Sequence, residues 1–170
     1  RFNSVCFVYR DSLYVFGGTD NSSNMNEIVR YDLSTQNSGE WTTIAKVNEA
    51  NQRGGVAFVV EDKVYAGLGE KSNGIRNGFY VSSDSLTKWE LIPSIPAQLG
   101  VISSGVYDEQ KKSFFMIDND GKIWEYNLTT EQWTSRSLWI RMKNYHMFML
   151  DGSIYILSLI HISEPTRPRL

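Results

Sequence analysis

Apolar and polar positions follow one arrangement four times along this chain: an apolar run, a short polar turn and a second apolar run. The four segments are residues 4–18, 54–69, 101–118 and 145–157. Apolar runs that flank short polar turns are typical of β-hairpins, and Asp151-Gly152 in the last segment is the strongest of the four turn signals. The pattern therefore predicts four β-hairpins.

The four hairpins are spaced at intervals of about 40 to 50 residues. An aromatic residue marks the second run of each one: Tyr14, Tyr65, Phe115 and Tyr155. Two more strand-like segments follow each of the first three hairpins, so a complete unit has four strands. Four strands at this period are typical of a β-propeller blade. We therefore predict an all-β fold, a partial β-propeller with three four-stranded blades and the first hairpin of a fourth.

The predicted blades cover residues 1–52, 53–99, 100–140 and 141–156. A Trp opens the last strand of each complete blade: Trp41, Trp89 and Trp133. Large aromatic side chains dominate the burial of protein cores, and we expect these three to pack between blades. The first strand of each unit is apolar on both faces, which favours an inner strand between neighbouring blades and a buried Cys6.

One group of residues in the first unit resembles a Kelch repeat. It consists of "LYVFGG", which ends at Gly17 and Gly18, the pair Tyr31-Asp32, and Trp41. The later units keep the pattern less closely, and the resemblance extends over residues 1–156. It implies a partial Kelch-type β-propeller in which Gly17 and Gly18 have structural roles. Because this fold hosts both binding proteins and enzymes, the resemblance leaves the activity open.

Two arginines are the candidate ligand-binding residues. Arg1 and Arg53 precede the first hairpins of units one and two by about the same distance. The Kelch resemblance implies that an Arg at this place can lie near the mouth of the central channel and bind anionic ligands, and its forked guanidinium suits carboxylates. Unit three has Gln98-Leu99 there and unit four offers Arg141 or Lys143, so the ring is partial. The alternative is that Arg53 pairs with a carboxylate or the backbone of a neighbouring blade.

A second local resemblance lies in unit two. The segment "SSDSLTKW" at residues 82–89 is similar to a loose Asp-box, the turn found in sialidase propellers, with Ser82, Asp84 and Trp89 matching. Asp and Ser side chains in such turns satisfy backbone donors. The resemblance therefore implies a structural role for Asp84 rather than a catalytic site.

Composition narrows the chemistry further. The net charge of −2 gives no electrostatic reason to expect a nucleic-acid partner, and no apolar run is long enough to span a membrane. Cys6 is the one cysteine and His146 and His161 are the two histidines, so no disulfide, no Cys-based zinc site and no Ser-His-Asp triad is indicated. We predict no catalytic residue, no metal site and no cofactor.

The last residues depart from the repeat. Back-translated with suitable codons, residues 157–167 ("LSLIHISEPTR") resemble the transposase-end adapter of tagmentation sequencing libraries. We therefore expect the native sequence to end near Ile156 and residues 157–170 to be a non-native, adapter-derived tail. The alternative is an ordinary strand that ends in a polar tail.

These observations favour a non-enzymatic binding or scaffold module, a fragment of a propeller that presents loops and a central channel to a protein or glycan. An open stack of blades leaves apolar end faces uncovered, so the missing blades of the parent chain are further expected partners. One alternative is a carbohydrate-active propeller enzyme such as a Kelch-type sialic-acid mutarotase, and another is a cytoplasmic Kelch adaptor. Residues 82–96 are similar to bacterial extracytoplasmic propellers, which favours the periplasm or cell surface.

Overall fold

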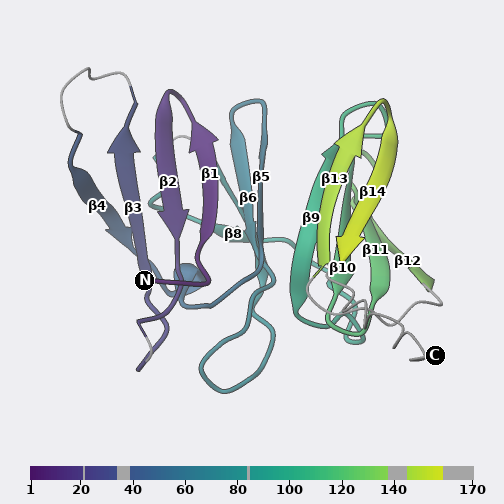
Figure 1. Ribbon diagram of the computed structural model, residues 1–170, viewed down its shortest axis with the longest axis horizontal. Coiled ribbons are helices and arrows are strands. Elements are labelled where there is room, and N and C mark those ends of the chain that lie inside the picture. Colours follow the sequence, from purple (N-terminus) through teal and green to yellow (C-terminus); the bar gives the residue numbers. More distant parts are fainter. Residues whose placement is uncertain (21, 34–38, 84, 138–144, 159–170) are drawn as a thin grey trace, which may run out of the picture.

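A computed structural model describes residues 1–20, 22–33, 39–83, 85–137 and 145–158. These residues form four antiparallel sheets, three with four strands and one with two (Figure 1). The strands of each sheet are neighbours in chain order, and each sheet is followed along the chain by the next. The predicted architecture of three four-stranded blades and one hairpin is therefore confirmed.

Each sheet is named as a blade, numbered 1 to 4. Blade 1 consists of β1 (Val5–Tyr9), β2 (Ser12–Phe16), β3 (Glu27–Asp32) and β4 (Trp41–Lys46). Blade 2 consists of β5 (Val56–Val60), β6 (Lys63–Gly67), β7 (Phe79–Ser83) and β8 (Glu90–Leu91). Blade 3 consists of β9 (Ile102–Asp108), β10 (Ser113–Asp118), β11 (Lys122–Asn127) and β12 (Gln132–Ser137). Blade 4 consists of β13 (Tyr145–Leu150) and β14 (Ser153–Ser158).

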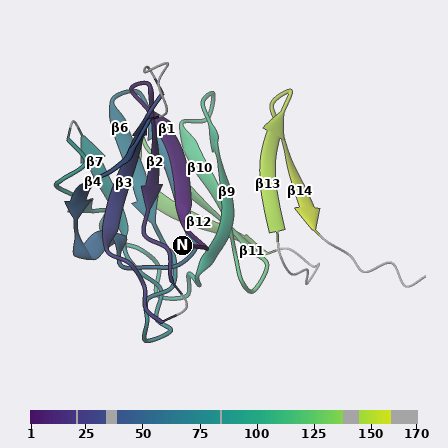
Figure 2. The ribbon, with the colours of Figure 1, turned by 60° about the vertical axis from the view of Figure 1, so that its left-hand side comes forward.

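The first strands of the four blades lie next to one another: β1 contacts β5, β5 contacts β9, and β9 contacts β13. This arrangement is that of a propeller, in which the first strand of each blade is the innermost. A short 3₁₀ helix, η1 (Asn48–Ala50), lies in the connection from blade 1 to blade 2. Figure 2 shows β13 and β14 at the end of the row of blades, beyond β9.

The hairpin turns have the backbone that their sequences predict. Asp151 and Gly152 both have positive φ, at 49° and 71°, and so do Arg10 and Asp11, at 45° and 56°. Two consecutive residues with positive φ make the turn whose twist matches that of the flanking strands. The turns therefore explain why each apolar run folds back on its neighbour.

Three apolar layers separate the blades. Blades 1 and 2 enclose Phe7, Phe16 and Val64, among others, and blades 2 and 3 enclose Phe58 and Phe114, whose rings stack with centroids 4.3 Å apart. The third layer, between blades 3 and 4, contains Phe115, Ile117 and Met147. Alternate residues of each inner strand enter one layer, because side chains of a strand point to opposite faces.

The expectation that every inner strand is buried on both faces is wrong for β1. Val5, Phe7 and Tyr9 are buried, but Cys6 and Val8 are exposed. The reason is tertiary: within the described part of the chain, no sheet covers the outer face of blade 1. At the other end, β14 continues through Ser158, two residues beyond the predicted limit of blade 4. The rest of the expected tail, residues 159–170, lies outside the described residues.

Candidate binding surface

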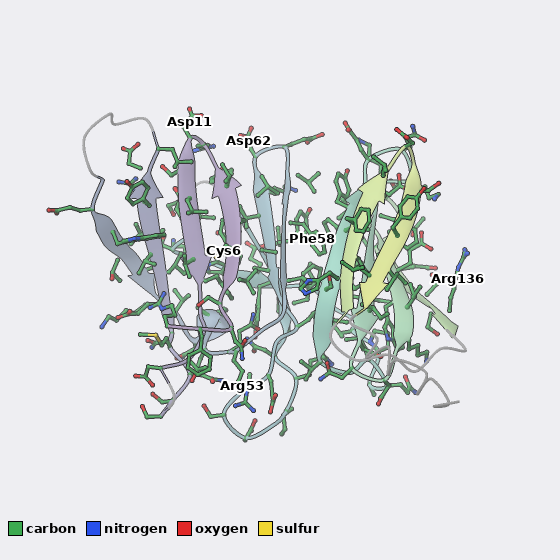
Figure 3. All side chains as sticks on the ribbon, in the orientation of Figure 1. Cys6, Asp11, Arg53, Phe58, Asp62 and Arg136 are labelled. Atoms are coloured by element: carbon green, nitrogen blue, oxygen red, sulfur yellow. The ribbon has the colours of Figure 1, made fainter. Side chains whose placement is uncertain are left out.

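The loops at one edge of the blades form the candidate binding surface. They comprise the β2–β3 and β6–β7 loops and the connections from blade 1 to blade 2 and from blade 2 to blade 3, residues 17–20, 22–26, 47–55, 68–78 and 92–101. We call these segments the loop face. Figure 3 places Arg53 at this edge and Asp11 and Asp62 at the opposite edge. Figure 1 shows the β6–β7 loop projecting from the edge that carries Arg53.

The β6–β7 loop is a hydrogen-bonded arm, residues 69–77. Its base is closed by the N–H of Asn77, which donates to Gly69 O at 2.7 Å, and its tip by the N–H of Lys71, which donates to Ile75 O at 2.9 Å. Gly74 supplies the positive φ of 77° that the tip requires. Ile75 is exposed at this tip, next to the turn. The arm therefore holds an apolar side chain in solvent on an ordered backbone.

A cleft of about 320 Å³ lies between this arm and the η1 connection. Its lining side chains are all polar: Asn48, Asn51, Lys71, Ser72 and Asn73. Each Asn amide both donates and accepts hydrogen bonds, and the Lys ammonium donates only. The cleft therefore suits a ligand that offers alternating N–H and C=O groups together with a negative charge.

Two buried amides join the two walls of the cleft. Asn77, at the base of the arm, donates through Nδ2 to Gln52 Oε1 at 3.0 Å and to Glu49 O at 2.7 Å. Gln52 Oε1 also accepts from Gly69 N–H at 3.1 Å. Both side chains are fully buried. Sequence reasoning missed this pair, because 25 residues separate its members and neither belongs to a motif.

Arg53 lies at the foot of the arm and pairs with Glu70 of its own blade. Arg53 Nη2 lies 2.8 Å from Glu70 Oε1 and Nε lies 3.3 Å from Oε2, a bidentate geometry. These hydrogen bonds and the charge of Glu70 raise the pKa of Arg53 above its usual range. The alternative expected from the sequence was that Arg53 pairs with a neighbouring blade. The observed pairing within its own blade differs from that expectation. The Arg53 side chain is still 49% exposed.

Arg1 is more enclosed, with 17% of its side chain exposed. Its Nη2 lies 2.8 Å from Glu27 Oε2 and its Nε donates to Met25 Sδ at 3.0 Å. Lys46 Nζ shares Glu27, at 3.1 Å from Oε1. Arg1 is thus part of a three-residue ion-pair cluster at the edge of blade 1.

Backbone pairing shifts the equivalence of the two arginines by one residue. The backbones of Arg53 and Glu70 form an isolated antiparallel β-bridge, and the backbones of Phe2 and Thr19 form the same bridge in blade 1. Arg53 therefore corresponds to Phe2, and the counterpart of Arg1 is the buried Gln52. Of the other positions of the expected ring, Leu99 of the Gln98-Leu99 pair is buried. Arg141 and Lys143 lie outside the described residues.

Arg76 is a loop-face arginine that sequence reasoning missed. It is half-buried, and its Nε donates to Leu99 O at 2.8 Å while Nη1 donates to Asn77 O at 2.9 Å. Burial lowers the pKa of its guanidinium. Through these bonds to two carbonyl groups, Arg76 fastens the arm to the connection between blades 2 and 3.

The three tryptophans have different surroundings. Trp89 packs edge-on against Phe16 of blade 1, with centroids 5.1 Å apart, and Trp133 packs against Phe79 of blade 2 at 6.0 Å. Trp41 is 53% exposed and contacts Tyr31 of its own blade at 5.3 Å. Its face of blade 1 is the one that no described sheet covers.

Close backbone approaches explain the glycines. Gly17 and Gly18 have φ of 62° and 98°, and a Cβ on Gly17 would collide with the carbonyl oxygen of Ala50. Asp84 lies outside the described residues. Among the described residues near it, Ser82 Oγ donates to Lys88 O at 2.6 Å, and Trp89 Nε1 donates to Leu86 O at 3.0 Å.

The comparison with known protein families concerns the first blade. Residues 1–48 match the family model of the Kelch motif. This segment contains all four strands of blade 1 together with Gly17, Gly18 and Trp41. With four sheets in propeller order, the fold is that of a partial Kelch-type β-propeller. The comparison with curated proteins found no match.

The Kelch motif points to a propeller module of a kind typically used for protein binding. Within the described ranges, no three His, Cys, Asp or Glu side chains gather in a way that could hold a metal ion. No helix in the described part of the chain is long and apolar enough to cross a bilayer. His146, the described histidine, is exposed on β13.

Proposed function

We propose that this chain is a non-enzymatic binding module whose loop face receives a protein segment. The observation that carries this proposal is the ordered arm at residues 69–77, which holds Ile75 in solvent beside a cleft lined by polar side chains. An apolar anchor surrounded by polar groups is the usual anatomy of a protein-binding patch.

The arm is also suited to binding because it is already ordered. Interfaces lose free energy when a loop must be immobilised on binding, and a preorganised loop avoids this cost. The hydrogen bonds of Lys71 and Gly74 within the arm and the buried pair of Gln52 and Asn77 beneath it supply that order. An extended peptide would offer its main-chain groups to Asn48 and Asn51 in the cleft.

Arg53 is the arginine that we propose contacts a carboxylate of the partner. Its guanidinium is half exposed, and Glu70 holds it in one orientation at the foot of the arm. A second carboxylate can approach the donors that Glu70 leaves open, because a guanidinium has five N–H groups. We propose that the more enclosed Arg1 contributes to the same edge through the cluster with Glu27 and Lys46.

The same cleft favours a glycan as a second candidate ligand. Its amide and hydroxyl side chains, Asn48, Asn51, Ser72 and Asn73, are groups that pair with sugar hydroxyls. A panel of immobilised glycans distinguishes the two ligands, since the protein proposal expects binding to peptides and the glycan proposal expects binding to sugars.

Selection of a displayed random-peptide library on the chain tests the protein-binding proposal. The selected peptides should lose at least tenfold in affinity for Ile75→Ser and for Asn51→Ala. The matched control is Asp62→Ala, which changes an exposed side chain at the opposite edge and should leave affinity unchanged. Peptides that bind all three variants equally, or that lose binding only to Asp62→Ala, would overturn the proposal.

The open faces of the two end blades call for a partner other than the ligand of the loop face. We propose that a further blade covers the open face of blade 1 and the open face of blade 4, as each internal blade is covered by its neighbours. Blades of a longer parent chain would supply this cover. The open faces carry Cys6 and Val8 at one end and Phe148 and Tyr155 at the other.

A further inference from the structure

The interfaces between neighbouring blades in this chain share one construction. We call the face of a blade that meets the next blade along the chain its front, and the face that meets the preceding blade its back. The front of blade 1 presents Phe7, Tyr14 and Phe16 to the back of blade 2, which presents Ala57 and Val59.

The same positions meet at the second interface. Phe58 of blade 2 occupies the strand position of Phe7, since each pairs with a Tyr of the following strand, Phe7 with Tyr14 and Phe58 with Tyr65. Its ring lies directly against Gly105 of blade 3, where a Cβ would approach Phe58 Cζ to 2.8 Å. Gly105 in turn occupies the position of Cys6. At this interface, a front aromatic ring therefore lies over the Cys6 position of the next blade.

The third interface joins the front of blade 3 to the back of blade 4. Phe115 and Ile117 of blade 3 pack against Met147 and Ile156 of blade 4. Met147 occupies the position of Cys6, and its N–H donates to Ser104 Oγ of blade 3 at 2.9 Å. At each of the three interfaces of the described chain, the residue at the Cys6 position (Ala57, Gly105 or Met147) therefore packs against the apolar front of the preceding blade.

The front of blade 4 carries the pattern that elsewhere is covered by a next blade. Phe148 and Tyr155 are each 46% exposed, and their rings stack with centroids 5.4 Å apart and planes 12° apart. Phe7 and Tyr14 stack at the same centroid distance, with planes 9° apart, and are buried by blade 2. The front of blade 4 thus repeats the stacked Phe–Tyr pair of the front of blade 1.

The back of blade 1 carries the complementary pattern. A groove of about 480 Å³ runs across it, and its apolar lining includes Cys6, Val15, Val29 and Trp41. Val8, on the same face of β1, is 55% exposed. Trp41 occupies the place of Trp89, which in blade 2 receives Phe16 from the front of blade 1. The back of blade 1 is therefore shaped like the backs that receive a front inside the chain.

We infer that, where no further blade of a parent chain covers these faces, a second copy of this chain docks head to tail, with the front of blade 4 in one copy against the back of blade 1 in the next. The inference rests on the proposal that a further blade covers the end faces, and it names a second copy as the source of that blade. Phe148 of one copy then lies over Cys6 of the next, as Phe58 lies over Gly105. Cys6 is larger than Gly105 but smaller than Met147, and the groove around it leaves room for the ring.

Such an interface joins two different surfaces, so repeated docking builds an open filament of copies or a closed ring. Two variants with a charge at an exposed position block one surface each: Phe148→Glu blocks the front and Val8→Glu blocks the back. Circular dichroism should show unchanged strand content for both, because neither side chain is buried.

Sedimentation velocity provides the test. The mass of the unaltered chain should rise with concentration, and each variant alone should stay monomeric. An equimolar mixture should form dimers and nothing larger, because only one front and one back remain available. In that mixture half of the Cys6 thiols should be protected from Ellman's reagent, since Cys6 is covered only in the Phe148→Glu copy.

A disulfide trap checks the register. Phe148→Cys should cross-link to Cys6 of the next copy under mild oxidation, whereas Asp62→Cys, at an exposed turn, should leave Cys6 unlinked. A monomeric unaltered chain, association that survives both Glu variants, or a mixture that stays monomeric would each overturn the inference. None of these changes touches the loop face, so peptide binding there should persist and reports separately on the proposed function.

Discussion

Asn77 and Gln52 bury their side-chain amides against each other, with Nδ2 of Asn77 3.0 Å from Oε1 of Gln52. One residue belongs to the arm and the other to the connection between blades 1 and 2. Gln52 also donates to Gly54 O at 3.2 Å, and Asn77 Oδ1 accepts from Gly78 N–H at 2.9 Å. The pair thus satisfies its own polar groups and several backbone groups of the loop face.

Removing either amide should destabilise the fold by about 1–3 kcal/mol, because a buried polar partner is left unsatisfied. Urea unfolding of Asn77→Ala and Gln52→Ala measures this loss. The double variant should cost less than the sum of the two single variants, since each already breaks the shared hydrogen bond. Ser72→Ala, at an exposed position of the arm, is the control and should change stability by less than about 0.5 kcal/mol. Strict additivity would show that the two amides do not interact.

Asp118→Asn should destabilise blade 3 by about 1–3 kcal/mol. The buried carboxylate accepts from the N–H groups of Asp120 and Lys122 at 3.0 and 2.9 Å, and from Trp124 Nε1 at 2.8 Å. An Asn amide has one accepting oxygen, so its NH₂ group must face a donor. The midpoint of thermal unfolding should fall for Asp118→Asn and stay nearly constant for Asp120→Asn, whose side chain is exposed. Equal midpoints for the two variants would contradict this account.

Replacing Gly17 or Gly152 by alanine compares two costs: the strain of a positive φ alone, and that strain together with a steric collision. Gly152 has φ of 71° with open space around its Cα, so Gly152→Ala should lose only the conformational term of about 1–2 kcal/mol. Gly17 has a similar φ of 62°, but a new Cβ would meet the carbonyl oxygens of Ala50 and Gln52. Gly17→Ala should therefore lose about 1–3 kcal/mol more. Denaturant unfolding of the two variants compares them directly, and similar losses would mean that the loop at Gly17 relaxes.

The β2–β3 loop should hold its conformation down to an unusually low pH. Asp20 has a pKa of about 2, because its carboxylate accepts hydrogen bonds from Ser22 Oγ and from the N–H groups of Ser22 and Ser23. The pKa of an Asp in an unfolded chain is about 4. The contribution of the Asp20 carboxylate to the stability of the folded loop is therefore complete above that pH and is lost as the pH falls through about 2. Carbon-detected NMR titration of Asp20 measures the value. Ser22→Ala should raise it, and an unchanged pKa in that variant would refute the assigned cause.

Much of the fold follows from local patterns. The apolar runs of β13 and β14 and the Asp151-Gly152 turn between them predict a hairpin without reference to any other blade, because turn geometry is local. The repeat then predicts the number of strands in each blade. The loop face was harder to predict: Arg53 was identified as a candidate, but its pairing with Glu70 and its correspondence to Phe2 depend on strand register. A shift of one residue changes the face on which a side chain lies.

The amino-acid sequence by itself determined the hairpins, the strand count and the Kelch character of the first blade, since these depend on periodicity and on glycines at fixed places. Only the tertiary structure decided which apolar residues are covered. Cys6 and Met147 hold the same strand position, yet Met147 is buried by blade 3 and Cys6 is exposed. Burial is set by the neighbouring sheet, and a strand's own residues cannot specify whether that sheet is present.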